Sequence, residues 1–177
     1  MPNMSLGVTH VLISIILVDL YRDYITKHKK YFTIHTVFLA GFFGLLPDID
    51  IVLRMFASFL NFNVPVLLQH GEITHTPFFA FLFLIPAVIL WRKKKYKQAT
   101  YFYVATFAIL LHILLDYFIG GGRFEGIMWL FPLSLQTWKL HIINYFNLPN
   151  IPEAIDAIIL LGWLWHEEIK HKISDFI

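Results

Sequence analysis

The chain has 177 residues, of which 58% are hydrophobic, 18% aromatic and 15% charged, and its formal net charge is +2. This composition is too apolar for a soluble domain, so we expect a single membrane-embedded domain over residues 1–177. The absence of cysteine excludes disulfides and thiolate metal sites, which leaves His, Asp and Glu as metal-binding side chains. Nucleic-acid binding is not expected, because the basic residues lie between apolar runs.

Apolar runs predict an all-α polytopic bundle with about five spans. The runs cover residues 6–20, 31–46, 77–91, 100–119 and 154–165. Pro47, followed by Asp48 and Asp50, indicates the start of a further helix. Residues 51–68 are apolar but interrupted by polar side chains, which predicts an interfacial helix between spans two and three. The stretch 123–153 is rich in aromatic residues and proline, which is typical of a loop in the headgroup layer.

Positive charges predict the orientation of the bundle. Lys and Arg concentrate in residues 21–30, in residues 92–97 and in the C-terminal tail, which together hold 11 of the 14 basic residues. Because basic loops stay on the cytoplasmic side, we predict that the N-terminus lies outside and the C-terminus inside. Asp19, Arg22 and Asp23 are interpreted as the solvated inner end of the first helix.

Seven His and Asp residues fall on the outer side in this topology. His112 and Asp116 lie four residues apart within an apolar run, so a helix places them on one face, where polar groups usually have a function. Five more lie at the outer ends of predicted spans: His10 at the start of the first, Asp48 and Asp50 after the second, and His70 and His75 before the third. The basic residues were counted without reference to these seven, so their convergence independently supports a shared site. Imidazoles and carboxylates suit zinc, manganese or another divalent ion.

Four motifs in this order resemble a known family. They are the early His10, GLLPDID at 44–50, HGEITHT at 70–76 and HILLD at 112–116. As a set they resemble the YdjM-like family of bacterial and archaeal inner-membrane metal-dependent hydrolases, which is distantly similar to the zinc-dependent phospholipase C and S1/P1 nuclease group. The resemblance implies a helical fold, up to three zinc ions and phosphoester hydrolysis.

When the ligand positions of the family are transferred to this sequence, the resemblance implies these metal ligands: His10, Asp48, Asp50, His70, His75, His112 and Asp116. We assign catalytic roles to Asp50, His75 and Asp116, and we consider Glu72 a candidate general acid or base. Gly71 and Glu72 stand where members of the family commonly have Arg and Gly, so an arginine that could clamp an anionic substrate is missing from this motif.

The same residues also have structural interpretations. A buried hydrogen bond between helices would explain His112 and Asp116, and helix capping would explain one of Asp48 and Asp50 better than both. His10 could instead lie among headgroups.

The loop residues leave similar alternatives open. His70 and His75 are about 140° apart on an ideal helix, so they share a face only if the turn at Gly71 is irregular. Glu72 could be a solvated loop carboxylate. Two further residues on the outer side are weaker candidates for ligands of a second or third metal ion: Glu125 and His141.

The sequence therefore predicts an inner-membrane or plasma-membrane hydrolase with its active site toward the outer side. Bound zinc, or manganese, would activate water against a phosphoester of a lipid or another membrane-located substrate. The alternatives are a metal or proton transporter, a haem-binding electron carrier and a metal-binding structural protein. A transporter needs polar groups along a path to both sides, whereas the candidate residues lie at one end. Membrane lipid is the expected partner, and the oligomeric state is left open.

Overall fold

The computed structural model describes residues 6–27, 31–65, 69–119, 126–140, 142 and 151–171. Its main helices are α1 (Leu6–Leu20), α2 (Ile34–Gly44), α3 (Ile49–Phe59), α4 (Pro77–Arg92), α5 (Tyr96–Ile119) and α7 (Ile151–His171). Shorter turns are the π-helix η1 (Tyr21–Thr26) and the 3-10 helices η2 (Leu46–Asp48) and η4 (Ile73–His75). The described ranges contain no strand, only an isolated bridge between Ile127 and Trp138, so the all-α prediction is confirmed.

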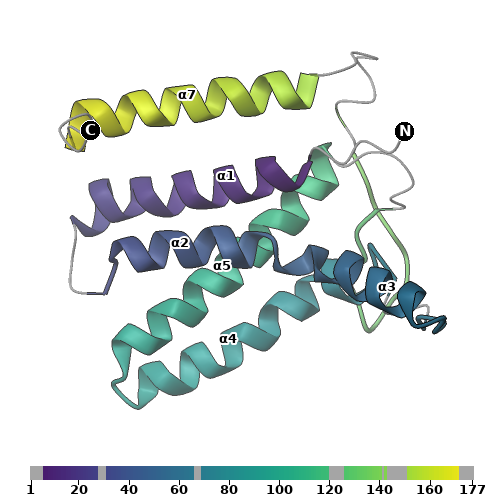
Figure 1. The fold of residues 1–177 in the computed structure, drawn as a ribbon. Coiled ribbons are helices and arrows are strands. Elements are labelled where there is room, and N and C mark those ends of the chain that lie inside the picture. The colour runs from purple at the N-terminus through teal and green to yellow at the C-terminus, as the bar shows by residue number, and fades with distance from the viewer. Residues whose placement is uncertain are drawn as a thin grey trace.

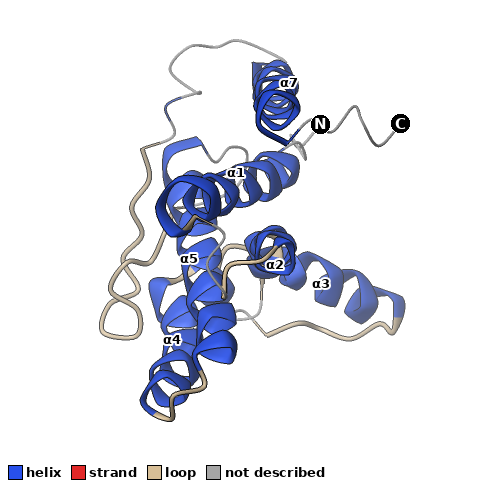
Figure 2. Cartoon of the chain, turned by 90° about the vertical axis from the view of Figure 1, so that its left-hand side faces the viewer, coloured by secondary structure: helices blue, strands red, loops and turns tan. Residues whose placement is uncertain are grey.

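The helices form a bundle with two distinct ends. Helix α1 packs against α2 and α7, α2 packs against α5, and α4 packs against α5. In Figure 1, α1 and α7 run in the same direction and α2 runs in the opposite one, while α4 and α5 form an antiparallel pair across them. The start of α1, the end of α2, the start of α4 and the end of α5 therefore meet at one end of the bundle, where α3 projects outward (Figure 2).

Local sequence explains where the helices near this end begin. The hydroxyl of Thr76 accepts a hydrogen bond from the backbone N–H of Phe79, and Pro77 occupies the first turn of α4. Both features favour a helix start at this point. Pro47 does the same for η2. His75 and Asp48 lie in two short turns between helices. The neighbouring residues therefore fix the positions of these turns.

The prediction of five spans is not confirmed by helix length and composition. Among the described residues, only α5, with 24 residues, is long and apolar enough to cross a membrane by itself. Helix α2 with the segment Leu46–Phe59 passes the same test only if this pair, bent by 42°, is one span. Helix α1 has 15 residues and α4 has 16, fewer than the about 20 that a bilayer requires.

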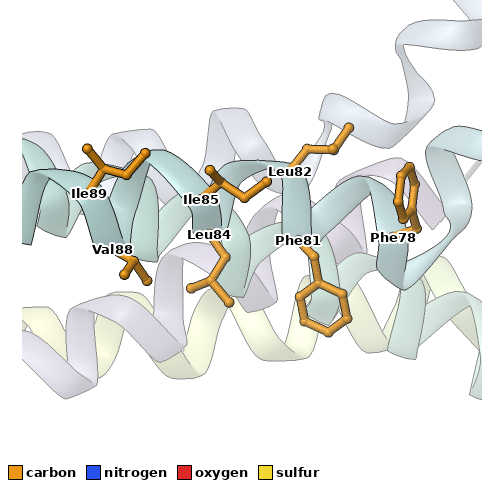
Figure 3. Close-up of a pocket in the computed structure, with 7 residues that line it drawn as sticks. All are labelled: Phe78, Phe81, Leu82, Leu84, Ile85, Val88 and Ile89. Carbon is orange, nitrogen blue, oxygen red and sulfur yellow. The ribbon is translucent and has the colours of Figure 1, made fainter.

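Among the described residues, apolar grooves of about 440 Å³ each lie on two parts of the bundle surface, and neither contains a predicted site residue. One runs along α4 between Phe78 and Ile89 (Figure 3). The other lies between α2 and α5 and is lined by Phe38, Phe42 and Tyr101, among others. Exposed apolar faces of this kind suit contact with lipid acyl chains.

The interpretation of Asp19, Arg22 and Asp23 as a solvated helix end was wrong, because all three are buried. Arg22 lies 2.8 Å from Asp19 and 3.1 Å from Asp23. From α7, Lys170 and His171 reach Asp23 at 3.2 Å and 2.8 Å. Helix α7 is longer than the predicted run 154–165, and its last turn covers these charges.

Candidate metal centre

The seven predicted ligands lie at the end of the bundle where α3 projects. His10 is in the second turn of α1, Asp48 ends η2, Asp50 is in the first turn of α3, and His112 and Asp116 lie in the C-terminal half of α5. His70 precedes η4, and His75 ends it. The structure thus brings together side chains that are up to 106 positions apart in the sequence.

Four side chains form the centre of this cluster. His112 Nε2 lies 3.4 Å from His75 Nε2 and 3.1 Å from Asp116 Oδ2. His75 Nε2 is 3.5 Å from the same Asp116 oxygen. Asp48 Oδ1 is 3.5 Å from His75 Nε2 and 3.7 Å from His112 Nε2. Ligand atoms of a tetrahedral zinc ion, bonded at about 2.0 Å, are about 3.3 Å apart, so the spacing of these four atoms fits one shared ion.

His10 extends the cluster on the side of α1. Its Nε2 lies 3.1 Å from Asp116 Oδ1, the second oxygen of the carboxylate that contacts His75 and His112. Its ring stacks on that of His112, with 4.0 Å between ring centroids. Both ring nitrogens of His10 are buried, and neither makes a well-aligned hydrogen bond within the described part of the chain. A buried imidazole in this state fits a metal ligand.

Asp50 organises the opposite side of the cluster. Its Oδ1 lies 2.9 Å from His70 Nδ1, and its Oδ2 is 3.4 Å from His75 Nδ1. Ligand atoms of Asp48, His70 and His75 lie within 4.8 Å of one another, as do those of His10, His112 and Asp116. The residues could therefore hold two ions, one on each side of the contacts between His75 and Asp116.

The irregular turn required for His70 and His75 to meet is present. Gly71 has a φ of +90°, a left-handed conformation that favours glycine. The following residues form the 3-10 helix that ends at His75. As a result, the rings of His70 and His75 lie 4.8 Å apart, edge to face.

Two groups that the sequence analysis did not identify orient the histidines. His112 Nδ1 lies 2.6 Å from the carbonyl oxygen of Gly44, which can only accept, so Nδ1 carries a proton and Nε2 faces the cluster. The hydroxyl of Thr74 donates to Asp50 Oδ2 at 2.7 Å and lies 3.0 Å from His75 Nδ1. Such outer partners commonly fix the tautomer of metal-binding histidines.

The capping interpretation of the two aspartates is not supported. Asp48 occupies the N-cap position of α3, but its side chain makes no capping hydrogen bond. Asp50 is buried, and its two oxygens face His70, Thr74 and His75. Both carboxylates therefore point into the cluster rather than toward the free N–H groups of the helix.

Electrostatics couple His75 to the surrounding carboxylates. Burial alone would lower the pKa of His75, but its contacts with Asp48 and Asp50 and the negative charge of Asp116 raise this pKa to about 9. In the metal-free protein at neutral pH the His75 ring is therefore protonated. A metal ion would have to displace the proton on Nε2, so we expect binding to release protons.

The remaining candidates are less clearly placed. Glu72 is half-buried on the turn between His70 and His75, and its carbonyl oxygen accepts a hydrogen bond from the backbone N–H of His75. Glu125 and His141 lie outside the described residues. Ligand roles for these two residues stay predictions.

Comparison with known protein families matches residues 4–172 to the family described as YdjM inner membrane protein. The chain belongs to this family. The match covers every motif that carried the resemblance, and it places this YdjM family protein in a membrane. The family description gives a location and no activity. No curated protein and no solved structure matches the chain.

Proposed function

We propose that this protein is a membrane-bound, metal-dependent hydrolase that cleaves a phosphoester of a lipid or another membrane-located substrate. The observation that carries the proposal is the spacing of His75, His112, Asp48 and Asp116, with separations of 3.1 to 3.7 Å between their facing atoms. In an apolar protein, such a concentration of His and Asp is costly unless these groups serve a function.

The side chains of the cluster would have different roles in such a site. His75, His112, Asp48 and Asp116 would hold one ion. His10 on one side of the cluster, or His70 on the other, would extend the ligand set toward a second. Bound zinc, or manganese, would supply an activated water and polarise the phosphoryl oxygen. Asp50 and Thr74 orient the two loop histidines. Glu72, on the same turn, is proposed as the general acid or base.

We further propose five crossings with the cluster toward the outer side. In Figure 1 the turn between α4 and α5 lies at the end of the bundle opposite α3. This turn carries the basic residues 92–97. The basic residues and the candidate ligands thus separate to opposite ends, as the positive-inside rule requires of a site on the outer side.

A transporter is the main alternative. The sequence suggested that the candidate ionisable residues lie at only one end of the bundle, and the structure weakens this argument against a transporter. Buried ionisable groups occur at both ends of α1, because Asp19 and Asp23 are buried as well as His10. The two groups are nevertheless separated by an apolar cluster that includes Val18, Val37, Ala40 and Val104. Apolar packing between the two groups of ionisable residues favours the hydrolase.

The test is elemental analysis of the purified protein, with phosphoesterase assays before and after chelation. We expect one to two zinc or manganese ions per chain, with activity lost on chelation and restored by the metal. His112→Ala and Asp116→Asn should lose metal and activity while the protein stays folded. His35→Ala is the matched control, since His35 lies in the first turn of α2, at the opposite end of that helix.

Two outcomes would overturn the proposal. If the wild-type protein holds no metal after reconstitution, the side chains of the cluster serve only to pack the helices. Metal uptake into proteoliposomes, without hydrolysis of any phosphoester, would support the transporter instead.

A further inference from the structure

Helix α3 has an exposed apolar side opposite its contact with the cluster. Val52, Met55, Phe56 and Phe59 project within an arc of about 100° on an ideal helix, and all four are exposed, with Phe59 at 84%. Asp50 lies on the other side of the helix and is 1% exposed. Figure 2 shows α3 projecting from the bundle, so the described elements do not cover this apolar side.

The bilayer is the partner that fits this surface. The family is one of inner-membrane proteins, and an amphipathic helix of this kind lies in the membrane interface with its apolar side among the acyl chains. Full burial of each large apolar side chain contributes about 1.5 to 3 kcal/mol. The apolar side of α3 therefore faces the outer leaflet, next to the metal ligands.

The depth of the ligands in α5 agrees with this position. At 1.5 Å per residue, His112 lies about 24 Å and Asp116 about 30 Å from the start of α5 at Tyr96. The hydrocarbon core of a bilayer is about 30 Å thick. With the basic loop before Tyr96 at the inner surface, the cluster lies at the outer boundary of the hydrocarbon, where lipid phosphates are found.

Arg54 stands on the cluster side of α3. It lies four residues after Asp50, which places it about 40° around the helix from Asp50 and one turn farther along. Arg54 is exposed, and it forms no ion pair within the described ranges. Asp50 contacts His70, whose side chain is 34% exposed and marks an open edge of the cluster. A guanidinium group is thus available one turn from this edge.

Charge complementarity indicates what this guanidinium group binds. Asp48, Asp50 and Asp116 concentrate negative charge in the cluster, and an anionic substrate must approach them. Among the described residues at this end of the bundle, the basic side chains are Arg54 and Lys139. Arginine binds phosphate oxygens in a bidentate manner and is the stronger phosphate ligand of the two.

We propose that Arg54 binds the phosphate of an amphiphilic substrate that reaches the metal centre within the outer leaflet, with its alkyl chain beside the apolar side of α3. The inference rests on the proposed function and specifies its substrate class, an anionic phosphate carried on a lipid-like chain. It assigns Arg54 a role in substrate selection and separates that role from metal binding.

The test uses zinc-loaded protein in phosphatidylcholine nanodiscs, with decylphosphonate as the probe because its C–P bond resists hydrolysis. Methylphosphonate is the matched probe without the chain, and binding is measured against empty nanodiscs. We expect decylphosphonate to bind at least about tenfold more tightly than methylphosphonate. Arg54→Gln should weaken decylphosphonate binding about tenfold, the loss expected for a charged hydrogen-bonding partner. Arg54→Lys should lie between, and Lys139→Gln should stay within about twofold of wild type.

Zinc content is measured first in every sample, which also shows that each variant retains its site. Wild type without zinc would overturn the proposed function. Zinc-loaded Arg54→Gln that binds decylphosphonate as wild type does would overturn only the present inference. Wild-type protein that fails to bind decylphosphonate, or that binds methylphosphonate equally well, would also overturn only the present inference.

Discussion

At the scale of single residues, Gly44 links the helix packing to the candidate metal centre. A Cβ atom at this position would lie 2.6 Å from Ser14 Oγ, 3.0 Å from Ser14 Cβ and 3.2 Å from the carbonyl oxygen of His10. The carbonyl oxygen of Gly44 in turn accepts the hydrogen bond from His112. Any side chain here would push α1 away from α2 and shift two candidate ligands at once.

We therefore expect Gly44→Ala to reduce bound metal and to destabilise the protein by about 1 to 3 kcal/mol, the usual cost of overpacking. Ser14→Gly in the same chain removes two of the three close contacts. It should therefore restore part of the bound metal and part of the stability. Metal per chain and thermal unfolding in detergent are the measurements. Gly162→Ala in α7 is the control, because a Cβ at this position would meet no atom within 4 Å. Full metal content in Gly44→Ala would contradict this account.

Sequence reasoning identified the residues that gather in the cluster but not the groups that orient them. His112 and Asp116 stood out because their spacing places two polar side chains on one face of an apolar helix. Gly44 contributes only its backbone carbonyl, and any residue has a carbonyl, so no sequence pattern could identify it. Thr74 lies inside the HGEITHT motif and could have been considered, since a hydroxyl next to a histidine is a common outer partner.

At the scale of elements, α7 is held to the bundle by polar contacts at both of its ends. Near its start, Thr9 of α1 donates a hydrogen bond to Asp156 at 2.7 Å. Near its end, Lys170 and His171 contact Asp23, which also contacts Arg22. Although burial would raise the pKa of Asp23, its hydrogen bonds with His171, Lys170 and Arg22 lower this pKa to about 2.

The pH dependence of stability follows from this shift. Because the pKa of Asp23 in the folded protein is below its ordinary value of 3.8, its contribution is complete above about pH 5 and is lost as the pH falls toward 2. Asp23→Asn should lower the free energy of unfolding at pH 7 by about 2 kcal/mol. The difference from wild type should shrink in acid. Thermal unfolding in detergent from pH 7 to pH 3 measures this.

The matched control for Asp23→Asn is Lys97→Gln, which removes an exposed charge from the same end of the bundle. It should unfold as wild type does at every pH. A constant difference between Asp23→Asn and wild type across the pH range would mean that the carboxylate acts through its shape rather than its charge.

Helix ends were predicted correctly where capping residues mark them. They were predicted poorly where a charged stretch was interpreted as a solvated tail. The start of α4 agrees with the predicted run because Thr76 and Pro77 define it. The last turns of α7 were interpreted as a charged tail, since His166, Glu167 and Lys170 look solvated in sequence. His166 contacts Tyr24 and Lys170 contacts Asp23, each more than 140 positions away, and such pairings leave no local pattern.

At the scale of the whole molecule, the proposed topology can be tested with a chain that has no native cysteine. Gln98→Cys places a thiol in the first turn of α5, and Gln136→Cys places one in the loop after Trp129; both positions are exposed. In intact cells, a membrane-impermeant maleimide should label Gln136→Cys and leave Gln98→Cys unlabelled. Both should react after permeabilisation. The reverse pattern in intact cells would place the metal centre on the cytoplasmic side.

The fold class and the gathering of the candidate ligands at one end of the bundle were accessible from the sequence, whereas the number of spans was not. Hydropathy identifies apolar runs, but it cannot show whether a run of 15 or 16 residues crosses the bilayer or stops inside it. Here α1 and α4 are this short, and α2 bends by 42° into the segment that follows. Packing against neighbouring helices decides such cases, and packing is not visible in composition.

The candidate ligands come from α1, η2, α3, η4 with the turn before it, and α5. A bound ion would tie these five segments together, and a ligand that binds only the folded state stabilises it by about 4 kcal/mol at a thousand times its Kd. Differences of this size change the abundance of a protein several-fold through proteolysis of unfolded chains. Metal supply would then set the lifetime of this protein in the membrane, and metal starvation would remove it rather than merely silence it.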